Sequence, residues 1–271
     1  MAQLEINNLK KIYPPDVLAL DDISFEVEKG EFLIIIGLSG SGKSTLLRCI
    51  NRLIEPTEGS IKFEGQEVTT ASSKELKEIR EEIGMIFQRF NLIERSLVLT
   101  NVLTGQLGEL SFWRSMLGRF PREMKNTAHE KLETVGIPEQ AFKRADELSG
   151  GQQQRVGIAR ALMQEPDVIL ADEPVASLDP VLAHTILGYL ERSNVDDGMT
   201  VICSLHYLDL VQRYATRVIG LRDGEVVYRG SGDDIRGMSD EQFKEIYGEE
   251  ASRVSAGPRQ PNQDTSEEAE E

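Results

Sequence analysis

A glycine-rich segment that ends in lysine, serine and threonine follows a short apolar run near the start of the chain. Residues 37–45 read GLSGSGKST and come directly after the apolar run 32–36. Between a predicted buried strand and a helix predicted to start at Leu46, the spacing G-x-x-x-x-G-K-[ST] is typical of a phosphate-binding loop. Its glycines let backbone N–H groups converge on one anion, and the helix dipole adds to that attraction.

We expect this loop to hold the phosphates of a nucleotide. Lys43 would reach the β- and γ-phosphates, and Ser44 would give its hydroxyl to a magnesium ion. The other loop residues expected to contact the nucleotide are Gly37, Ser39, Gly40, Ser41, Gly42 and Thr45.

Two carboxylates end another apolar run. Asp172 and Glu173 follow residues 168–171, which read VILA. We expect Asp172 to hold magnesium, directly or through water. Glu173 is one residue further on and is predicted to point elsewhere, where it could accept a proton from the water that attacks the γ-phosphate.

Two more polar residues end apolar runs. Gln88 follows residues 85–87, and His206 follows residues 200–205. Because ligands of open parallel sheets bind outside the carboxyl ends of the strands, we expect both side chains at the nucleotide pocket. Gln88 is a candidate ligand for magnesium or the attacking water, and His206 is a candidate γ-phosphate sensor.

A turn of serine and glycine precedes a second predicted helix, over residues 153–162. This turn contains Ser149, Gly150, Gly151 and Gln152. It predicts a second anion site at a helix N-terminus. One chain then has two phosphate sites but only one lysine loop. The economical explanation is a head-to-tail homodimer, in which residues 149–151 of one subunit close over the nucleotide held by Lys43 of the other.

Asp179 and Tyr13 each have two interpretations. Asp179 suits the N-cap of a helix and Pro180 its first position, and a contact across the dimer would be additional. Tyr13, in a predicted turn after the first strand, could stack on an adenine ring or could simply pack against its neighbours.

Apolar periodicity predicts the elements that position these residues. Residues 4–6, 23–27 and 61–63 alternate between apolar and polar types, which predicts an antiparallel sheet around the loop. Residues 73–83 predict an amphipathic helix that Gly84 ends, followed by a buried strand over 85–88. Two short strands, 217–221 and 225–228, would close the sheet.

Residues 91–163 lack strand alternation and are predicted to form a helical subdomain inserted into the sheet domain. Gly136 is expected to end one of its helices. Residues 110–121 are rich in large apolar and basic side chains. They could form subdomain core or a protein-docking surface, and the sequence favours neither.

Composition excludes several classes of function. The net charge of −16 argues against nucleic acid as a partner, since phosphate contacts need clustered Lys and Arg. Apolar runs are far shorter than the roughly 20 residues that span a bilayer, and the N-terminus lacks the pattern of a signal peptide, so we expect a cytoplasmic protein. Cys49 and Cys203 are predicted to be reduced, buried thiols. Residues 249–271 are acidic and predicted to be a disordered tail.

In this order, the motifs resemble those of an ABC-type ATPase. Residues 37–45, Gln88, 148–152, 168–173, 177–179 and His206 resemble the Walker A, Q-loop, signature, Walker B, D-loop and H-loop. The resemblance covers about residues 1–248. It implies an α/β fold: a P-loop NTPase (RecA-like) core with an antiparallel β subdomain and an inserted helical subdomain. It also implies a homodimer that sandwiches and hydrolyses ATP with Mg²⁺, with Glu173 as general base and Tyr13 stacked on adenine.

Within that family, the chain is most similar to the ATP-binding subunits of phosphonate importers. The matching stretches are residues 101–108, 113–121, 204–210 and 217–224, whereas Tyr207 and the acidic tail depart from the pattern. The resemblance implies integral membrane permease subunits, an extracytoplasmic solute-binding protein, and a peripheral place on the cytoplasmic face of the membrane. The segment after Gln88 would dock a helix of the permease. The alternatives are an ABC transport ATPase for amino acids, phosphate or lipoprotein release, an ABC ATPase outside transport, and a nucleotide-dependent scaffold that does not hydrolyse ATP.

Overall fold

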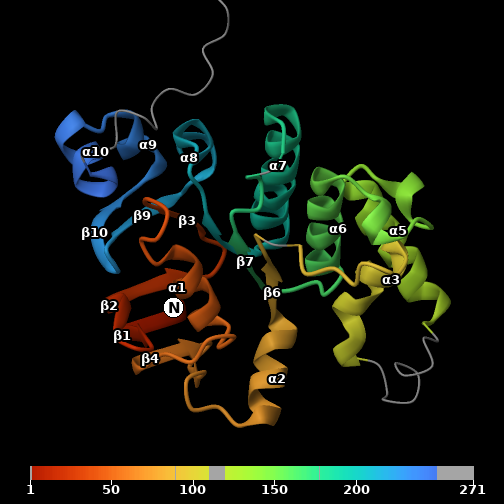
Figure 1. Ribbon diagram of the computed structural model, residues 1–271, viewed down its shortest axis with the longest axis horizontal. Helices are drawn as coiled ribbons and strands as arrows, with labels where there is room; N and C mark the ends of the chain where they lie inside the picture. Colours follow the sequence, from red (N-terminus) through yellow and green to blue (C-terminus); the bar gives the residue numbers. More distant parts are fainter. Residues whose placement is uncertain (1, 89, 110–119, 177, 249–271) are drawn as a thin grey trace, which may run out of the picture.

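The computed structural model, which describes residues 2–88, 90–109, 120–176 and 178–248, contains two β-sheets (Figure 1). One sheet is antiparallel, in the order β2-β1-β4-β5. Its strands are β1 (Ala2–Tyr13), β2 (Val17–Glu28), β4 (Glu58–Phe63) and β5 (Gln66–Glu67). The alternating residues of the sequence bury one face of this sheet, as period-two patterns do. The predicted antiparallel subdomain is therefore confirmed.

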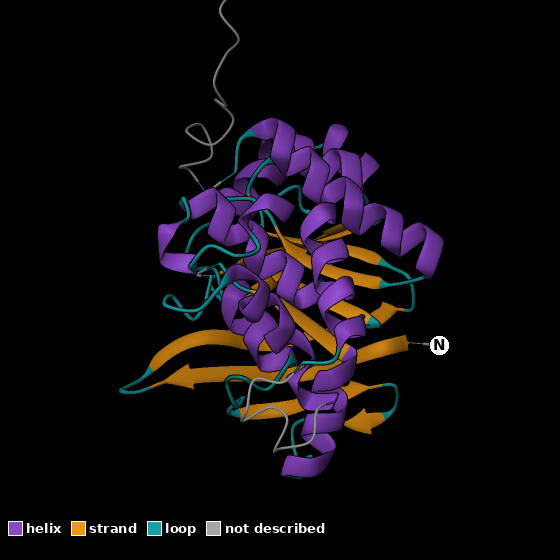
Figure 2. Ribbon diagram, turned by 90° about the vertical axis from the view of Figure 1, so that its right-hand side faces the viewer, coloured by secondary structure: helices purple, strands orange, loops and turns teal. Residues whose placement is uncertain are grey.

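The second sheet has the order β10-β9-β3-β8-β7-β6, and all its neighbours are parallel except β9 and β10. Its strands are β3 (Phe32–Ile36), β6 (Ile83–Ile86), β7 (Val168–Asp172), β8 (Thr200–Ser204), β9 (Arg217–Arg222) and β10 (Glu225–Gly230). Figure 2 shows the strands of the two sheets in separate groups. Continuous apolar runs form the parallel strands because both of their faces are covered.

Helices surround the parallel sheet. Their bounds are α1 (Lys43–Ile50), α2 (Ser73–Glu82), α3 (Val98–Leu103), η1 (Thr104–Glu109), α5 (Arg122–Thr134), η2 (Pro138–Gln140), η3 (Ala145–Glu147), α6 (Gly150–Leu162), α7 (Pro180–Asp197), α8 (Leu208–Tyr214), α9 (Gly232–Arg236) and α10 (Asp240–Tyr247). Helices α3, α5 and α6 pack on one another at one side of the molecule (Figure 1). Within the described part of 91–163, β structure is limited to an isolated bridge between Leu97 and Arg144.

The core consists of two apolar clusters, one on each face of the parallel sheet. Leu33 and Ile35 of β3 face the cluster under the antiparallel sheet, whereas Ile34 and Ile36 face the cluster under the helices. A strand with both faces buried divides its side chains in this way. The predicted burial of Cys49 and Cys203 as free thiols is confirmed. Burial raises the pKa of the Cys49 thiol to about 11.

The prediction that Gly84 ends a helix is wrong. Helix α2 ends at Glu82, and Gly84 lies inside strand β6, opposite Ile169 of β7. A Cβ atom at Gly84 would lie 2.8 Å from both Ile169 Cδ1 and Pro166 Cγ. The glycine therefore serves close packing rather than helix termination. Strand β6 ends at Ile86, so Gln88 follows the strand instead of closing it.

Other boundaries differ by a few residues. Helix α1 begins at Lys43 rather than Leu46, and α6 begins at Gly150, so both signature glycines are helical. Tyr13 is the last residue of β1 and does not lie in the turn. The helix end at Gly136 is confirmed, with φ of 70° just after α5.

Most of segment 110–121, Ser177 and the tail 249–271 lie outside the described residues. The limits of the helical subdomain and the character of the tail remain predictions. Among the helices of the described ranges, none has both the length and the apolar character needed to cross a membrane.

Candidate active site

The predicted phosphate loop borders a cavity of about 160 Å³ at the carboxyl edge of the parallel sheet. The lining residues are Ala19, Ser39, Gly40, Gly42, Lys43, Ser44, Thr45, Gln88 and Glu173. All of these except Ala19 are predicted from the sequence. Four parts of the chain, around Ala19, residues 39–45, Gln88 and Glu173, therefore meet at one cavity.

The backbone of the loop depends on glycine at two closely packed positions. Gly37 has φ of 145°, and a Cβ atom there would lie 2.2 Å from the carbonyl oxygen of Leu221. Gly42 has φ of 103°, and its Cβ would lie 2.6 Å from the carbonyl oxygen of Ala19. Strand β9 and strand β2 thus press against the loop and fix its path between β3 and α1.

Lys43 is held inside the loop. Its ammonium group donates hydrogen bonds to the carbonyl oxygens of Gly37 and Leu38, both at 2.7 Å. Burial lowers the pKa of Lys43, and the nearby charges of Glu173 and Asp172 oppose that shift. The loop's own carbonyls therefore hold a buried cation at the edge of the cavity.

Asp172 is fully buried and joins two elements. Its Oδ1 accepts hydrogen bonds from Ser44 Oγ at 2.7 Å and from Ser204 Oγ at 3.3 Å. Arg48 Nη2 lies 3.5 Å from the other carboxylate oxygen. A hydroxyl and a carboxylate side by side are oxygen donors of the kind that Mg²⁺ prefers. No group of three or more His, Cys, Asp or Glu side chains in the described ranges could hold a metal alone. This donor set fits a Mg²⁺ ion that takes its remaining ligands from phosphates and water.

Glu173 has a backbone in the left-handed region, with φ of 49°, and its carboxylate has other partners than that of Asp172. Its backbone N–H donates to Ser204 Oγ at 2.9 Å. Gln88 Nε2 donates to Glu173 Oε2 at 2.7 Å, and His206 Nε2 contacts Glu173 Oε1. The hydrogen bond with His206 is the main cause that lowers the pKa of Glu173, assisted by the charges of His206 and Lys43. Glu173 is therefore ionised at neutral pH.

The predicted signature residues and Asp179 do not line this cavity. Ser149 caps helix α6: its Oγ accepts from Gln152 N at 3.4 Å, and Gln152 Oε1 accepts from Ser149 N at 3.0 Å. Asp179 caps α7 by accepting from Leu182 N at 3.0 Å, as predicted. The interpretation of Asp179 as an N-cap is thus confirmed, and Ser149 forms a cap of the same kind. Their contacts with a nucleotide across a dimer remain predictions.

Tyr13 lies beside the loop. Its hydroxyl is 3.5 Å from Thr45 Oγ1, and Lys11 Nζ is 5.0 Å from the centre of its ring. The ring is therefore oriented by contacts with the loop and with its own strand.

Ser204 is a site residue that the sequence interpretation missed. It is in register with Asp172 on the neighbouring strand and contacts both Asp172 and the backbone of Glu173. Its signal in the sequence is a hydroxyl near the end of an otherwise apolar run. Ala19 and Arg48 were also missed, and nothing in their local sequence marks them.

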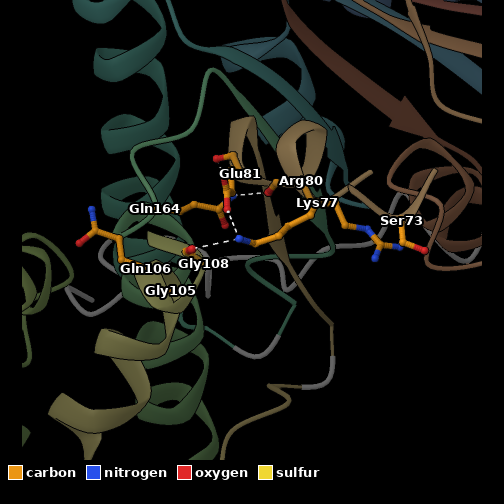
Figure 3. A pocket seen from close by; sticks show the side chains of 8 residues that line it. All are labelled: Ser73, Lys77, Arg80, Glu81, Gly105, Gln106, Gly108 and Gln164. Carbon is orange, nitrogen blue, oxygen red and sulfur yellow. Dashed lines mark hydrogen bonds and ion pairs between the residues drawn. The ribbon is translucent and has the colours of Figure 1, made fainter. Parts of the chain in front are cut away.

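A second cavity, of about 250 Å³, lies between α2, η1 and the end of α6 (Figure 3). There Lys77 donates to the carbonyl oxygen of Gly108 at 3.1 Å and pairs with Glu81 at 3.2 Å. None of the predicted site residues lines this cavity. Its polar contacts join α2 to η1.

Comparison with known proteins identifies the family. The model of the ABC transporter family matches residues 20–176. This chain belongs to the ABC transporter family. The solved ABC cassettes share its fold: a dimeric post-hydrolysis structure of the ATP-binding cassette MJ0796 bound to ADP and Pi has a TM-score of 0.76 and 35% identity, over 84% of this chain and 98% of that chain. A nucleotide-free ATP-binding cassette from an ABC transporter has a TM-score of 0.76 and 30% identity, over 95% of this chain and 100% of that chain.

Curated members of the ABC transporter family are similar over almost the whole chain. The phosphonates import ATP-binding protein PhnC of Bdellovibrio bacteriovorus is 54% identical over 93% of this chain and 96% of its own length. The protein of the same name from Bacillus thuringiensis is 52% identical over 92% of this chain and 96% of its own length.

Proposed function

We propose that this chain is the ATP-hydrolysing subunit of an ABC importer and energises the uptake of phosphonates. The observation that carries the proposal is identity above 50%, over more than nine-tenths of the chain, with relatives named for phosphonate import. The cluster of Gln88, Glu173 and His206 around one carboxylate supports the hydrolytic part of the proposal.

ATP binding is assigned to the loop cavity. Residues 37–45 would surround the phosphates with backbone N–H groups, and Lys43 would exchange its carbonyl partners for the β- and γ-phosphates. Tyr13, oriented beside Thr45, would stack on the adenine ring. Ser44, Asp172 and Gln88 are the residues that would hold Mg²⁺. When bound, that ion neutralises charge on the phosphates.

Hydrolysis is assigned to the residues around Glu173. Its lowered pKa keeps the carboxylate ionised, and as general base it would take a proton from the attacking water. Gln88 and His206 hold the two carboxylate oxygens and so fix the direction of the base. His206 would also sense the γ-phosphate from the same edge of the sheet.

The working unit is proposed to be a head-to-tail homodimer. Residues 149–152 and Asp179 of one subunit would complete the site that contains Lys43 of the other, and ATP binding would close the dimer. Integral membrane permease subunits would take up the motion at the cytoplasmic face of the membrane. An extracytoplasmic solute-binding protein would deliver the phosphonate to them.

The deciding experiment measures uptake of a radiolabelled alkylphosphonate by cells that lack this gene. The cells are complemented with the wild type or with Glu173→Gln, and uptake of inorganic phosphate and of amino acids is measured in parallel. Rescue of phosphonate uptake by the wild type alone supports the proposal. Rescue of another solute, while the purified protein hydrolyses ATP, would reject phosphonates and keep the importer ATPase.

A further inference from the structure

Helix α6 reaches the segment that carries the candidate base. Gln154, on the second turn of this helix, is only 2% exposed. Its Nε2 donates a hydrogen bond to the carbonyl oxygen of Pro174 at 3.0 Å. Pro174 directly follows Glu173, so a side chain of α6 holds the backbone one residue beyond the candidate base.

Within the described residues, the side-chain amide of Gln154 forms a hydrogen bond through its Nε2 and not through its Oε1. Its Oε1 is buried and has no hydrogen-bond partner among the residues that the structure describes. Most buried polar atoms have a partner, so the hydrogen bond of Nε2 with Pro174 satisfies one end of this amide and links α6 directly to the residues that follow β7.

The opposite side of the Glu173 segment is held by β8. Glu173 donates its backbone N–H to Ser204 Oγ at 2.9 Å, while its φ of 49° is unusual for a residue with a side chain. A backbone in this conformation persists where neighbouring groups hold it in place. Ser204 accepts the N–H of Glu173, and Gln154 donates to the carbonyl oxygen of the next residue, Pro174.

The same helix also holds the segment that follows Gln88. Arg160 donates to the carbonyl oxygens of Asn91 at 2.6 Å and Phe90 at 3.1 Å. Gln88 in turn donates to Glu173. Helix α6 therefore contacts the chain next to both partners of this hydrogen bond, through Arg160 beside Gln88 and through Gln154 beside Glu173. A displacement of α6 would therefore act on both partners of this hydrogen bond.

We propose that Gln154 is a positioning residue for Glu173, and that it couples the turn 149–152 to the catalytic carboxylate of the same chain. The coupling rests on the proposed function, in which this turn contacts the ATP held by the other subunit. Ser149 caps the helix that carries Gln154, so contact at the cap is transmitted along one rigid element. ATP bound at one site of the dimer would then position Glu173 at the other site.

The test compares Gln154→Met with Gln153→Met in the full-length protein. Methionine keeps the length of the side chain and removes the donor. Gln153 is the matched control because its Nε2 donates to the carbonyl oxygen of Ala145 at 2.9 Å, a contact from the same helix that does not involve the Glu173 segment. ATPase rates are measured across ATP concentrations, together with thermal unfolding.

For Gln154→Met we expect kcat to fall about tenfold, KM to stay within twofold, and the Hill coefficient for ATP to move toward 1. Gln153→Met should keep the kcat and the Hill coefficient of the wild type. A loss of stability without a change in the Hill coefficient would overturn the proposal, and so would equal effects of the two variants. If Gln154→Met does not fold, Gln154→Asn replaces it, since its shorter amide keeps the polarity but not the reach. An inactive wild type would refute the proposed function, whereas an active wild type with an unaffected Gln154→Met refutes only the role of Gln154.

Discussion

Gln88 and Glu173, 85 residues apart in the sequence, share a hydrogen bond of 2.7 Å between Gln88 Nε2 and Glu173 Oε2. The order of the sheet explains this contact. Strand β7, which precedes Glu173, lies between β6, which precedes Gln88, and β8, which precedes His206. The carboxylate that follows the middle one of these three strands is therefore held from both sides, by the amide of Gln88 and by the imidazole of His206.

Removal of the charge of Glu173 should separate binding from hydrolysis. Glu173→Gln keeps the size of the side chain but cannot accept the proton of the attacking water, so we expect kcat to fall at least about 100-fold. ATP binding should persist, because Lys43 and Ser44 are unchanged. Size-exclusion chromatography with ATP should then show a stable dimer, and turnover at the wild-type rate would refute the assignment of Glu173 as base.

The pH dependence of stability should reveal the contacts of Glu173. Its pKa in the folded chain lies below the ordinary value of 4.5, chiefly because of the hydrogen bond with His206. The contribution to stability is therefore complete above pH 4.5 and is lost as the pH falls through the folded-state pKa. Glu173→Gln lacks this titration, so the stability curves of the two proteins should converge below pH 4.5. Thermal unfolding from pH 6 to pH 3 measures this, and parallel curves would contradict it.

Ser204→Ala should lower both the stability of the protein and kcat, although it removes only one oxygen atom. The substitution removes a hydrogen bond to Asp172 and leaves the backbone N–H of Glu173 without its acceptor. A buried donor that loses its partner costs about 1–3 kcal/mol, so we expect lower stability together with a reduced kcat. Cys203→Ala, one residue earlier on the same strand, is the control, because Cys203 faces the apolar core. Equal effects of the two variants on kcat would show that the Ser204 hydroxyl has no special role.

The apolar runs of the parallel strands and the N-cap Asp179 could be predicted from the sequence because their signals are local, whereas several boundaries differ by a few residues. Asp172, Glu173 and His206 each follow an apolar run, and the carboxyl ends of parallel strands meet at one edge. Gly84 was misinterpreted because its role depends on Ile169, which a local pattern does not reveal. Ser204 has a local signal, a hydroxyl near the end of an apolar run, but only the register of β7 and β8 places it against Asp172.

Gly37 and Gly40 lie in the same loop but should differ in their tolerance of alanine. At Gly37 a Cβ would lie 2.2 Å from the carbonyl oxygen of Leu221, whereas at Gly40, with φ of 86°, no atom lies within 4 Å. Gly40→Ala should cost only the strain of a positive φ, about 1–2 kcal/mol. Gly37→Ala adds a clash with backbone of about 1–3 kcal/mol more. Chemical denaturation measures the difference, and equal losses would show that the loop can move away from β9.

Tyr13 should control the affinity for ATP and not the chemical step. Loss of a stacking ring costs about 1–3 kcal/mol of base binding, so Tyr13→Ala should raise KM for ATP about tenfold and leave kcat within twofold. Tyr13→Trp keeps an aromatic face and should retain KM near the wild-type value. Steady-state ATPase kinetics distinguish the two interpretations of this residue. If Tyr13→Ala and Tyr13→Trp both keep the wild-type KM, the ring is only a packing residue between Lys11 and Thr45.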